Sequence, residues 1–339
     1  MKMEEIRLDF LQNPKIDYEL LQSLSCDYNL HSIANNDLLD RIMSFRSKLA
    51  NMFFKSLSLP FSFNCAGFLE LFLNFKNIYV FDSCNYEIRK ASSIASNFIN
   101  VYSIKLDSIN IENNSNLDST LVIAPYMHED IFSFNDILNL KSIMKITLPN
   151  SLLALDISYA LALGLDICKD LADIYLMNGV PLSLIRGMGI IISNKEYTSP
   201  LYQNAVSEAF YHAITKRRNI KNNFNNKTNI EIFNKLRQDL GDDIDLFASN
   251  FAPNTLPLRF KSINTRNLIQ HLYLDDIYIQ SSQNCHLRLG QPSHTLLSLG
   301  FNPSQARELC ALSFIEIKDI DFVVDKIIQT YKIIKLMDF

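Results

Sequence analysis

Residues 152–192 read LLALDISYALALGLDICKDLADIYLMNGVPLSLIRGMGIII, and this stretch decides the fold. It opens with an apolar run, 152–165, which Asp156 interrupts and whose length suits a buried strand followed by a helix. Short apolar strands alternate with helical segments on both sides of it. Because this alternation is typical of a mostly parallel sheet with helices on both faces, the sequence predicts an α/β protein.

Hydrophobic spacing places further elements along the chain. Apolar residues three and four apart over 37–54 predict a helix that buries one face. The other elements predicted in the first half are a strand running into a helix at 61–75, strands at 77–81, 101–106, 120–124, 144–147 and 152–155, and helices at 87–97 and 134–141. Those of the second half are helices at 231–240, 265–272, 303–312 and 320–335 and strands at 256–263 and 277–281.

Composition and charge exclude several classes of protein. The chain has 339 residues, of which 48% are hydrophobic and 20% charged, and its net charge is −4. A weak negative charge argues against a nucleic-acid partner, which needs a broad basic surface. No apolar run reaches the roughly 20 residues that cross a bilayer, and no basic-then-apolar signal opens the chain. We therefore expect no membrane partner and a cytoplasmic location.

The cysteines and histidines show no pattern of a metal site. The six cysteines form no C-x-x-C pair and have no metal-ligand spacing with the six histidines. Free thiols fit a reducing compartment, which agrees with the cytoplasm. The cluster His128-Glu129-Asp130 has the side chains of a metal or acid–base group, but adjacent residues in a loop rarely converge on one ion. We predict no metal site.

A shift in composition marks a boundary between two domains. Residues 216–229 are dense in asparagine and lysine and contain no long apolar run, as expected of a connection. The length of the chain also favours one large domain plus a smaller one. We predict a large domain over 16–215 and a small α+β domain over 230–339, which the N-terminal segment 1–15 joins.

The stretch 152–192 also resembles the centre of a cysteine desulfurase, a class V aminotransferase-like enzyme that depends on pyridoxal 5′-phosphate (PLP). In that family a strand ends in an aspartate that pairs with the pyridinium nitrogen of PLP, and Asp156 matches this aspartate. The family then shows Ser-Gly-His-Lys, whose lysine forms the Schiff base with the cofactor. The matching tetrad of this chain ends in Pro181, which has no primary amine.

The C-terminal third carries the strongest resemblance. Residues 284–300 read NCHLRLGQPSHTLLSLG and match the family's cysteine loop and the turn into its next helix. Cys285 falls on the cysteine that carries a persulfide in that family. The resemblance implies the α/β fold of type I PLP enzymes, with a mainly parallel seven-stranded sheet in the large domain and a small C-terminal α+β domain.

Other cofactor contacts of the family are altered at the matching positions. The turn that holds the phosphate of PLP matches Ala66 and Gly67, next to Phe68, and has lost its hydroxyl and its acid. The ring-stacking histidine of the family matches Tyr86. The resemblance implies a relic PLP site at Asp156, Tyr86, Ala66 and Gly67. We expect no bound cofactor, because the covalent anchor is missing.

These features predict a degenerate cysteine desulfurase-like protein that is not itself a catalyst. It would act in iron–sulfur cluster assembly or sulfur transfer by pairing with an active desulfurase or its scaffold, as a homodimer or a heterodimer. One alternative is an active class V enzyme that mobilises sulfur from L-cysteine through Cys285. Another is a purely structural homodimer with an unrelated binding role.

Overall fold

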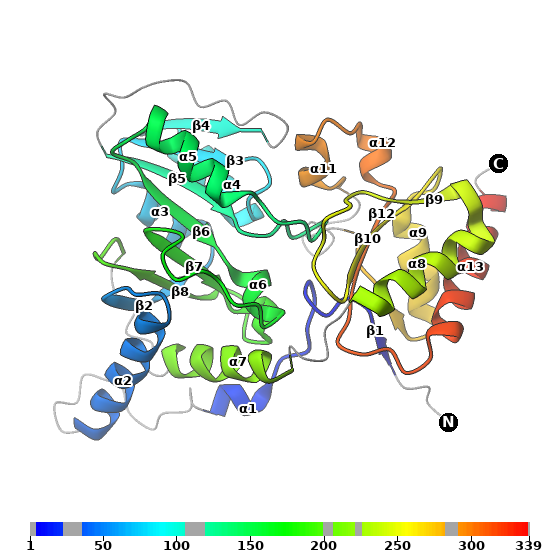
Figure 1. Ribbon diagram of the computed structural model, residues 1–339, viewed down its shortest axis with the longest axis horizontal. Helices are drawn as coiled ribbons and strands as arrows, with labels where there is room; N and C mark the ends of the chain where they lie inside the picture. Colours follow the sequence, from blue (N-terminus) through cyan, green and yellow to red (C-terminus); the bar gives the residue numbers. More distant parts are fainter. Residues whose placement is uncertain are drawn as a thin grey trace. The chain divides into compact units, whose positions relative to one another are not determined.

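The computed structural model describes residues 5–22, 36–105, 119–198, 206–220, 226–281 and 291–337. The chain forms two compact units (Figure 1). The large unit comprises residues 14–127 and 135–221, and the small unit comprises 1–13, 128–134 and 222–339. Among the helices that the structure describes, none combines the length and the apolar character needed to span a membrane.

The large unit is built on a seven-stranded sheet with the order β2-β8-β7-β6-β5-β3-β4. Neighbouring strands from β7 to β4 run parallel, whereas β8 is antiparallel to both β7 and β2. The strands are β2 (Leu57–Ser62), β3 (Asn77–Phe81), β4 (Asn100–Ile104), β5 (Thr120–Pro125), β6 (Leu152–Asp156), β7 (Ile174–Asn178) and β8 (Met188–Ser193). The predicted mainly parallel sheet is thus confirmed.

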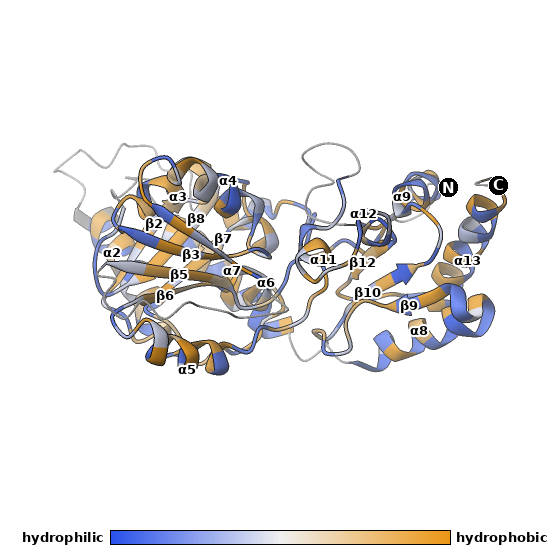
Figure 2. Cartoon of the chain, turned by 90° about the horizontal axis from the view of Figure 1, so that it is seen from above, coloured by the Kyte–Doolittle hydropathy of each residue, from blue (hydrophilic) through white to orange (hydrophobic). Residues whose placement is uncertain are grey.

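Helices cover both faces of this sheet. Figure 2 shows α3 and α4 on one side of it and α5 on the other. Every residue of β3, β5 and β8 is buried, as expected when no face of a strand meets water. The helices are α1 (Tyr18–Leu21), α2 (Asn36–Met52), α3 (Cys65–Phe72), α4 (Tyr86–Ala95), α5 (Ile137–Thr147), α6 (Ser158–Ala162) and α7 (Val206–Ile220), with a 3-10 turn η2 (Val180–Leu182).

The strand predicted at 144–147 is wrong, because these residues form the last turn of α5. Ile137, Leu140 and Met144 lie three and four residues apart and are all buried on one face of the helix. In residues 144–147 the apolar Met144 and Ile146 alternate with polar residues, which imitates the period of a strand, and so short a run could not distinguish the two structures.

The small unit combines a three-stranded antiparallel sheet, β12-β10-β9, with helices and a second short sheet. Its helices are α8 (Asn226–Leu240), α9 (Thr265–Leu274), α11 (His294–Ser298), α12 (Pro303–Ala306) and α13 (Ile320–Met337), with a 3-10 turn η4 (Gly241–Asp243). Its strands are β1 (Ile6–Arg7), β9 (Ile244–Leu246), β10 (Thr255–Phe260), β11 (Ile277–Tyr278) and β12 (Leu309–Ser313). One hydrophobic core joins the strands with α8, α9 and α13, and it includes Leu8 and Cys310.

The helix predicted at 303–312 is also wrong in its second half. After α12 the chain turns into β12, whose five residues are all buried and pair with β10. A strand buried on both faces shows no alternation, so its apolar run resembles a buried helix.

The N-terminal segment completes the small unit. Strand β1 pairs in parallel with β11. The carbonyl of Leu8 accepts a hydrogen bond from the Ser313 amide at 2.7 Å, and the Leu11 amide donates to Ser313 Oγ at 2.9 Å. Residues some 300 positions apart in the sequence therefore share one core.

Candidate functional site

One edge of the seven-stranded sheet gathers the site residues predicted in the large unit. Since β2 and β7 are both antiparallel to β8, the carboxyl ends of β2, β3, β5, β6 and β7 meet at this edge. Gly67, Tyr86, Asp156 and Pro181 each follow one of these strand ends or terminate it. Open α/β sheets bind ligands at this edge.

Asp156 is the last residue of β6 and is only 5% exposed. Its Oδ1 accepts hydrogen bonds from the amide of Ser158, at 3.0 Å, and from the Ser158 hydroxyl. Burial raises the pKa of the Asp156 carboxyl to about 6, although the hydrogen bonds from Ser158 oppose this shift. The carboxyl group therefore gains or loses its proton around pH 6. Only its ionised form would bind a cationic ring nitrogen.

Ser158 fixes Asp156 relative to the neighbouring strand. Its Oγ accepts a hydrogen bond from the Asn178 amide at 2.7 Å, so one hydroxyl joins the ends of β6 and β7. The sequence prediction missed this residue. A signal was present, because a serine two positions after a strand-end aspartate is well placed to bond back to its side chain.

Pro181 lies in a closed turn after β7. The Gly179 amide donates to the Met188 carbonyl at 2.8 Å, and the Val180 amide donates to Asn178 Oδ1 at 3.0 Å. Pro181 itself is buried within the turn η2. The sequence between Lys169 and Lys195 contains no lysine, so this turn carries no side-chain amine.

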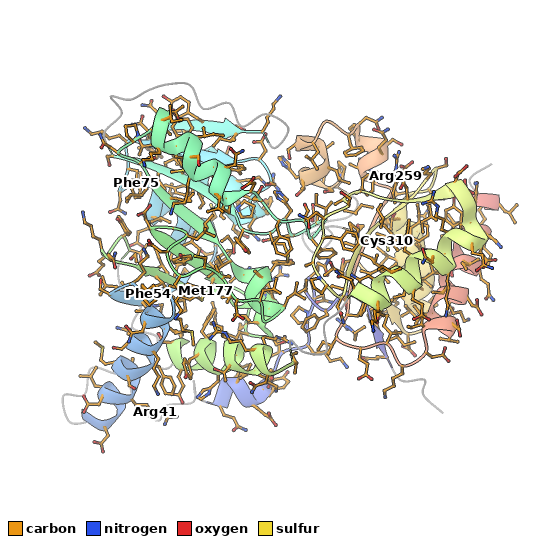
Figure 3. The ribbon with its side chains drawn as sticks, in the orientation of Figure 1. Arg41, Phe54, Phe75, Met177, Arg259 and Cys310 are labelled. Atoms are coloured by element: carbon orange, nitrogen blue, oxygen red, sulfur yellow. The ribbon has the colours of Figure 1, made fainter. Side chains whose placement is uncertain are left out.

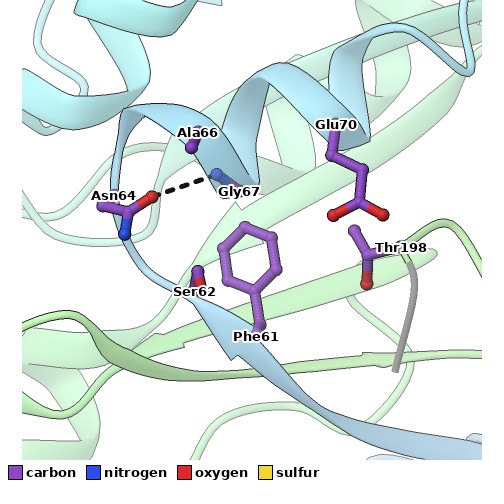
Figure 4. Close-up of a pocket in the computed structure, with 7 residues that line it drawn as sticks. All are labelled: Phe61, Ser62, Asn64, Ala66, Gly67, Glu70 and Thr198. Carbon is purple, nitrogen blue, oxygen red and sulfur yellow. Dashed lines mark hydrogen bonds between the residues drawn. The ribbon is translucent and has the colours of Figure 1, made fainter. Parts of the chain in front are cut away.

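Ala66 and Gly67 lie in the first turn of α3, next to a shallow depression of about 150 Å³. Figure 4 shows its lining, which consists of Phe61, Ser62, Asn64, Ala66, Gly67, Glu70 and Thr198. A Cβ on Gly67 would lie 2.0 Å from the Ser62 carbonyl oxygen, so only glycine lets α3 approach β2 this closely. The amide of Gly67 donates to Asn64 Oδ1 at 3.1 Å.

Tyr86 begins α4 and is half-buried. The helix is capped by Asn85, whose Oδ1 accepts from the Glu87 amide at 2.9 Å. The Lys90 ammonium lies 6.0 Å from the centre of the Tyr86 ring, one helical turn away. Tyr86 thus follows the carboxyl end of β3, at the same sheet edge as Asp156.

The residues of this edge suit the ring nitrogen of PLP but not its phosphate. The buried Asp156 is the carboxylate that a pyridinium nitrogen requires. At the start of α3, however, Glu87 Oε2 already accepts the Cys65 amide at 2.9 Å. A phosphate placed at the same amide would meet a second negative charge.

The other candidate residues fall outside the described part of the large unit. Cys285 lies outside the described residues. His128, Glu129 and Asp130 belong to the small unit, where Asp130 accepts a hydrogen bond from the Ser293 hydroxyl at 2.6 Å. In the part of the chain that the structure describes, no group of three or more potential ligand side chains could hold a metal ion.

Cys310, a buried cysteine of the small unit, is not exposed to solvent. Cys310, which Figure 3 labels, lies on β12 in the core of the small unit and is fully buried. Complete burial strongly raises the pKa of the Cys310 thiol, so the reactive thiolate is suppressed. Cys310 is therefore a core residue.

Comparison with solved structures identifies the class of fold. No family model matches the sequence, and a search of curated proteins returns no match either. The structure nevertheless matches the type I fold of PLP-dependent enzymes over nearly its whole length. This agreement includes the mostly parallel central sheet.

The matching structures include NifS-like proteins and a cysteine desulfurase. A NifS-like protein from Rickettsia africae is 15% identical, with a TM-score of 0.74 and coverage of 98% of this chain and 99% of that one. Another NifS-like protein is 14% identical, with a TM-score of 0.79 over 97% and 100%. A cysteine desulfurase from Thermococcus onnurineus is 12% identical, with a TM-score of 0.69 over 98% and 95%. The resemblance to cysteine desulfurases is thus confirmed for the fold.

The same comparison overturns the expectation of a chain without a cofactor. Cysteine desulfurases are PLP-dependent, and this chain has their fold. The expectation rested on the missing covalent anchor at Pro181, beside the altered contacts at Ala66, Gly67 and Tyr86. A covalent anchor is only one of the contacts that hold a coenzyme, and Asp156 keeps its place at the end of β6.

Proposed function

We propose that this chain is a cysteine desulfurase-like protein that does not itself release sulfur from cysteine. It acts in sulfur transfer or iron–sulfur cluster assembly by associating with an active desulfurase or its scaffold. The dimeric state, whether with a second copy or with an active desulfurase, belongs to this proposal. The observation that carries it is the closed turn around Pro181.

The turn after β7 supports the loss of turnover on chemical grounds. Desulfuration through PLP needs an amine that exchanges the coenzyme between the protein and the substrate. Proline offers no amine, and the bond from Gly179 to Met188 fixes the turn against β8. A protein with this turn can keep the fold, and with it a surface for partners, without keeping the chemistry.

A retained feature favours the second candidate, an active desulfurase. Asp156 is still buried, and Ser158 still directs it at the sheet edge. In that case PLP would be held by contacts other than a lysine at Pro181, and Cys285 would accept the sulfur. Lys90 supplies an amine close to Tyr86 for such a role.

Sulfide release separates the two candidates. The full chain with added PLP and L-cysteine should produce no more sulfide than PLP and L-cysteine without protein. The Cys285→Ser variant should give the same background value. Release above background that disappears in this variant would establish the active enzyme and refute the proposal.

Association is measured on the same preparation. Mixed with an active cysteine desulfurase from the same organism, the chain should sediment as a complex in analytical ultracentrifugation. If the chain neither releases sulfide nor binds the desulfurase or its scaffold, the sulfur-transfer role is wrong and the structural homodimer is favoured.

A further inference from the structure

Two helix ends converge on one carboxylate in the large unit. Helix α3 begins at Cys65 and α4 at Tyr86, and the two helices pack against each other. Glu87 lies in the first turn of α4, yet its Oε2 accepts the Cys65 amide of α3 at 2.9 Å. Since the N-terminus of a helix carries a partial positive charge, both helices stabilise this anion.

The rest of the α3 end is also supplied with acceptors from the chain itself. The Gly67 amide donates to the Asn64 side chain at 3.1 Å, and the Phe68 amide donates to the Asn64 carbonyl at 3.1 Å. Three of the first four amides of α3 therefore have internal partners. Among the described residues, no lysine or arginine forms an ion pair with Glu87, and the hydrogen bond to its carboxylate comes from the Cys65 backbone amide.

We infer that Glu87 is an internal anion that occupies the start of α3 and sets the affinity of this chain for phosphate-bearing ligands. A phosphate ester reaches the Cys65 amide only when the Glu87 carboxylate is displaced. The inference goes beyond the proposed function and is independent of whether the chain turns over cysteine.

The electrostatic reason is the repulsion between two anions at one amide. A phosphate monoester carries up to two negative charges, and near a protein surface like charges about 4 Å apart repel by several RT. The amide oxygen of a glutamine would still accept the Cys65 N–H but would carry no charge. Replacing Glu87 by glutamine therefore removes the repulsion and keeps the local hydrogen bond.

The test compares a ligand with and without its phosphate. 4-Deoxypyridoxine 5′-phosphate and 4-deoxypyridoxine share the ring but lack the aldehyde, so neither attaches to lysines. Isothermal titration calorimetry of the full chain should show similar affinities for both. Glu87→Gln should tighten binding of the phosphate form by about tenfold or more and leave the phosphate-free form unchanged.

Asp170→Asn is the control, because it removes a carboxylate charge from a side chain that is 89% exposed and that precedes β7, at the opposite edge of the sheet from the start of α3. It should change the affinity for the phosphate form by less than about threefold, since an exposed charge at the far edge is largely screened. The inference is wrong if the wild-type chain already binds the phosphate form much more tightly than the phosphate-free form. It is equally wrong if Glu87→Gln and Asp170→Asn have the same effect.

A measurement on the wild-type chain covers the case in which the variant does not fold. With ¹⁵N-cysteine labelling, the Cys65 amide resonance should not shift when inorganic phosphate is titrated to millimolar concentration. A saturable shift of this resonance would show phosphate at the amide despite Glu87 and would overturn the inference.

Discussion

At the scale of single residues, Asp156 belongs both to the central sheet and to the candidate site. It terminates a buried strand, accepts two hydrogen bonds from Ser158, and has a pKa raised to about 6 by burial. The unfolded chain would hold this carboxyl near its ordinary value of 3.8. The folded state therefore binds the proton more tightly than the unfolded state, and ionisation at neutral pH opposes folding.

Asp156→Asn should remove this pH dependence, because asparagine keeps the acceptor oxygen and cannot ionise. Below pH 3.8 the raised pKa stabilises the native state fully, and this stabilisation is lost as the pH rises through 6. The unfolding free energy of the wild type relative to Asp156→Asn should fall by up to about 1.4 kcal/mol per pH unit from pH 4.5 to 6 and then level off.

Urea denaturation at several pH values measures this difference. Glu316→Gln, a charge-removing change at an exposed position of the small unit, should follow the wild-type curve. A constant difference between wild type and Asp156→Asn across this range would mean that Asp156 does not titrate there.

At the scale of elements, the contact between α3 and β2 depends on the absence of one side chain. Gly67 lies against the Ser62 carbonyl, and its neighbour Phe68 packs edge-on against Phe61 and Phe63. The aromatic contacts stabilise the packing of α3 against β2, and Gly67 leaves room for this close approach. The same turn presents the Cys65 amide to Glu87.

Gly67→Ala should displace α3 from β2, because the new methyl group has no space. Overpacking of this kind lowers the unfolding free energy by about 2–4 kcal/mol. Gly241→Ala is a useful comparison, since its Cβ would meet nothing within 4 Å and only the positive φ of 56° is strained. That variant should lose about 1 kcal/mol. Equal losses in urea denaturation would show that the close approach is not strained.

The sequence predicted elements better than it predicted contacts. Buried strands are apolar runs, so the central sheet and the place of Asp156 could be found from pattern and resemblance. The errors at 144–147 and 303–312 arose where a short apolar run fits two periods. The bond between Cys65 and Glu87 joins residues 22 apart on two helices, and no local pattern encodes it.

At the scale of the whole molecule, a segment near the start of the chain belongs to the same core as elements of the C-terminal third. Leu8 is fully buried in the small unit, and its carbonyl bonds to Ser313 of β12. Asp9 is buried beside it and forms an ion pair with Arg7, with 2.9 Å between Arg7 Nε and Asp9 Oδ1. The N-terminal segment thus supports a sheet formed by the C-terminal third.

Leu8→Ala should therefore destabilise the distant strand β12. Removing a fully buried leucine side chain lowers stability by about 2–5 kcal/mol. Hydrogen exchange should show faster exchange of the β12 amides, with little change in β5 of the large unit. Ile6→Ala, at a half-buried position of the same segment, should have a smaller effect. Uniform acceleration in both units would mean that they unfold as one.

The bond between Leu8 and Ser313 also sets an order of events during synthesis. A ribosome adds about 5–20 residues each second, so Ser313 follows Leu8 by roughly 15–60 s. The first strand partner of this segment, β11, is made at residues 277–278, and until then the segment around Leu8 has no strand to join, whereas the large unit's strands are all complete by residue 193. Leu8, Phe10 and Leu11, which are buried in the folded unit, stay without their partners until the last third of the chain is made, and a chaperone that holds extended peptides with apolar side chains would find its target there.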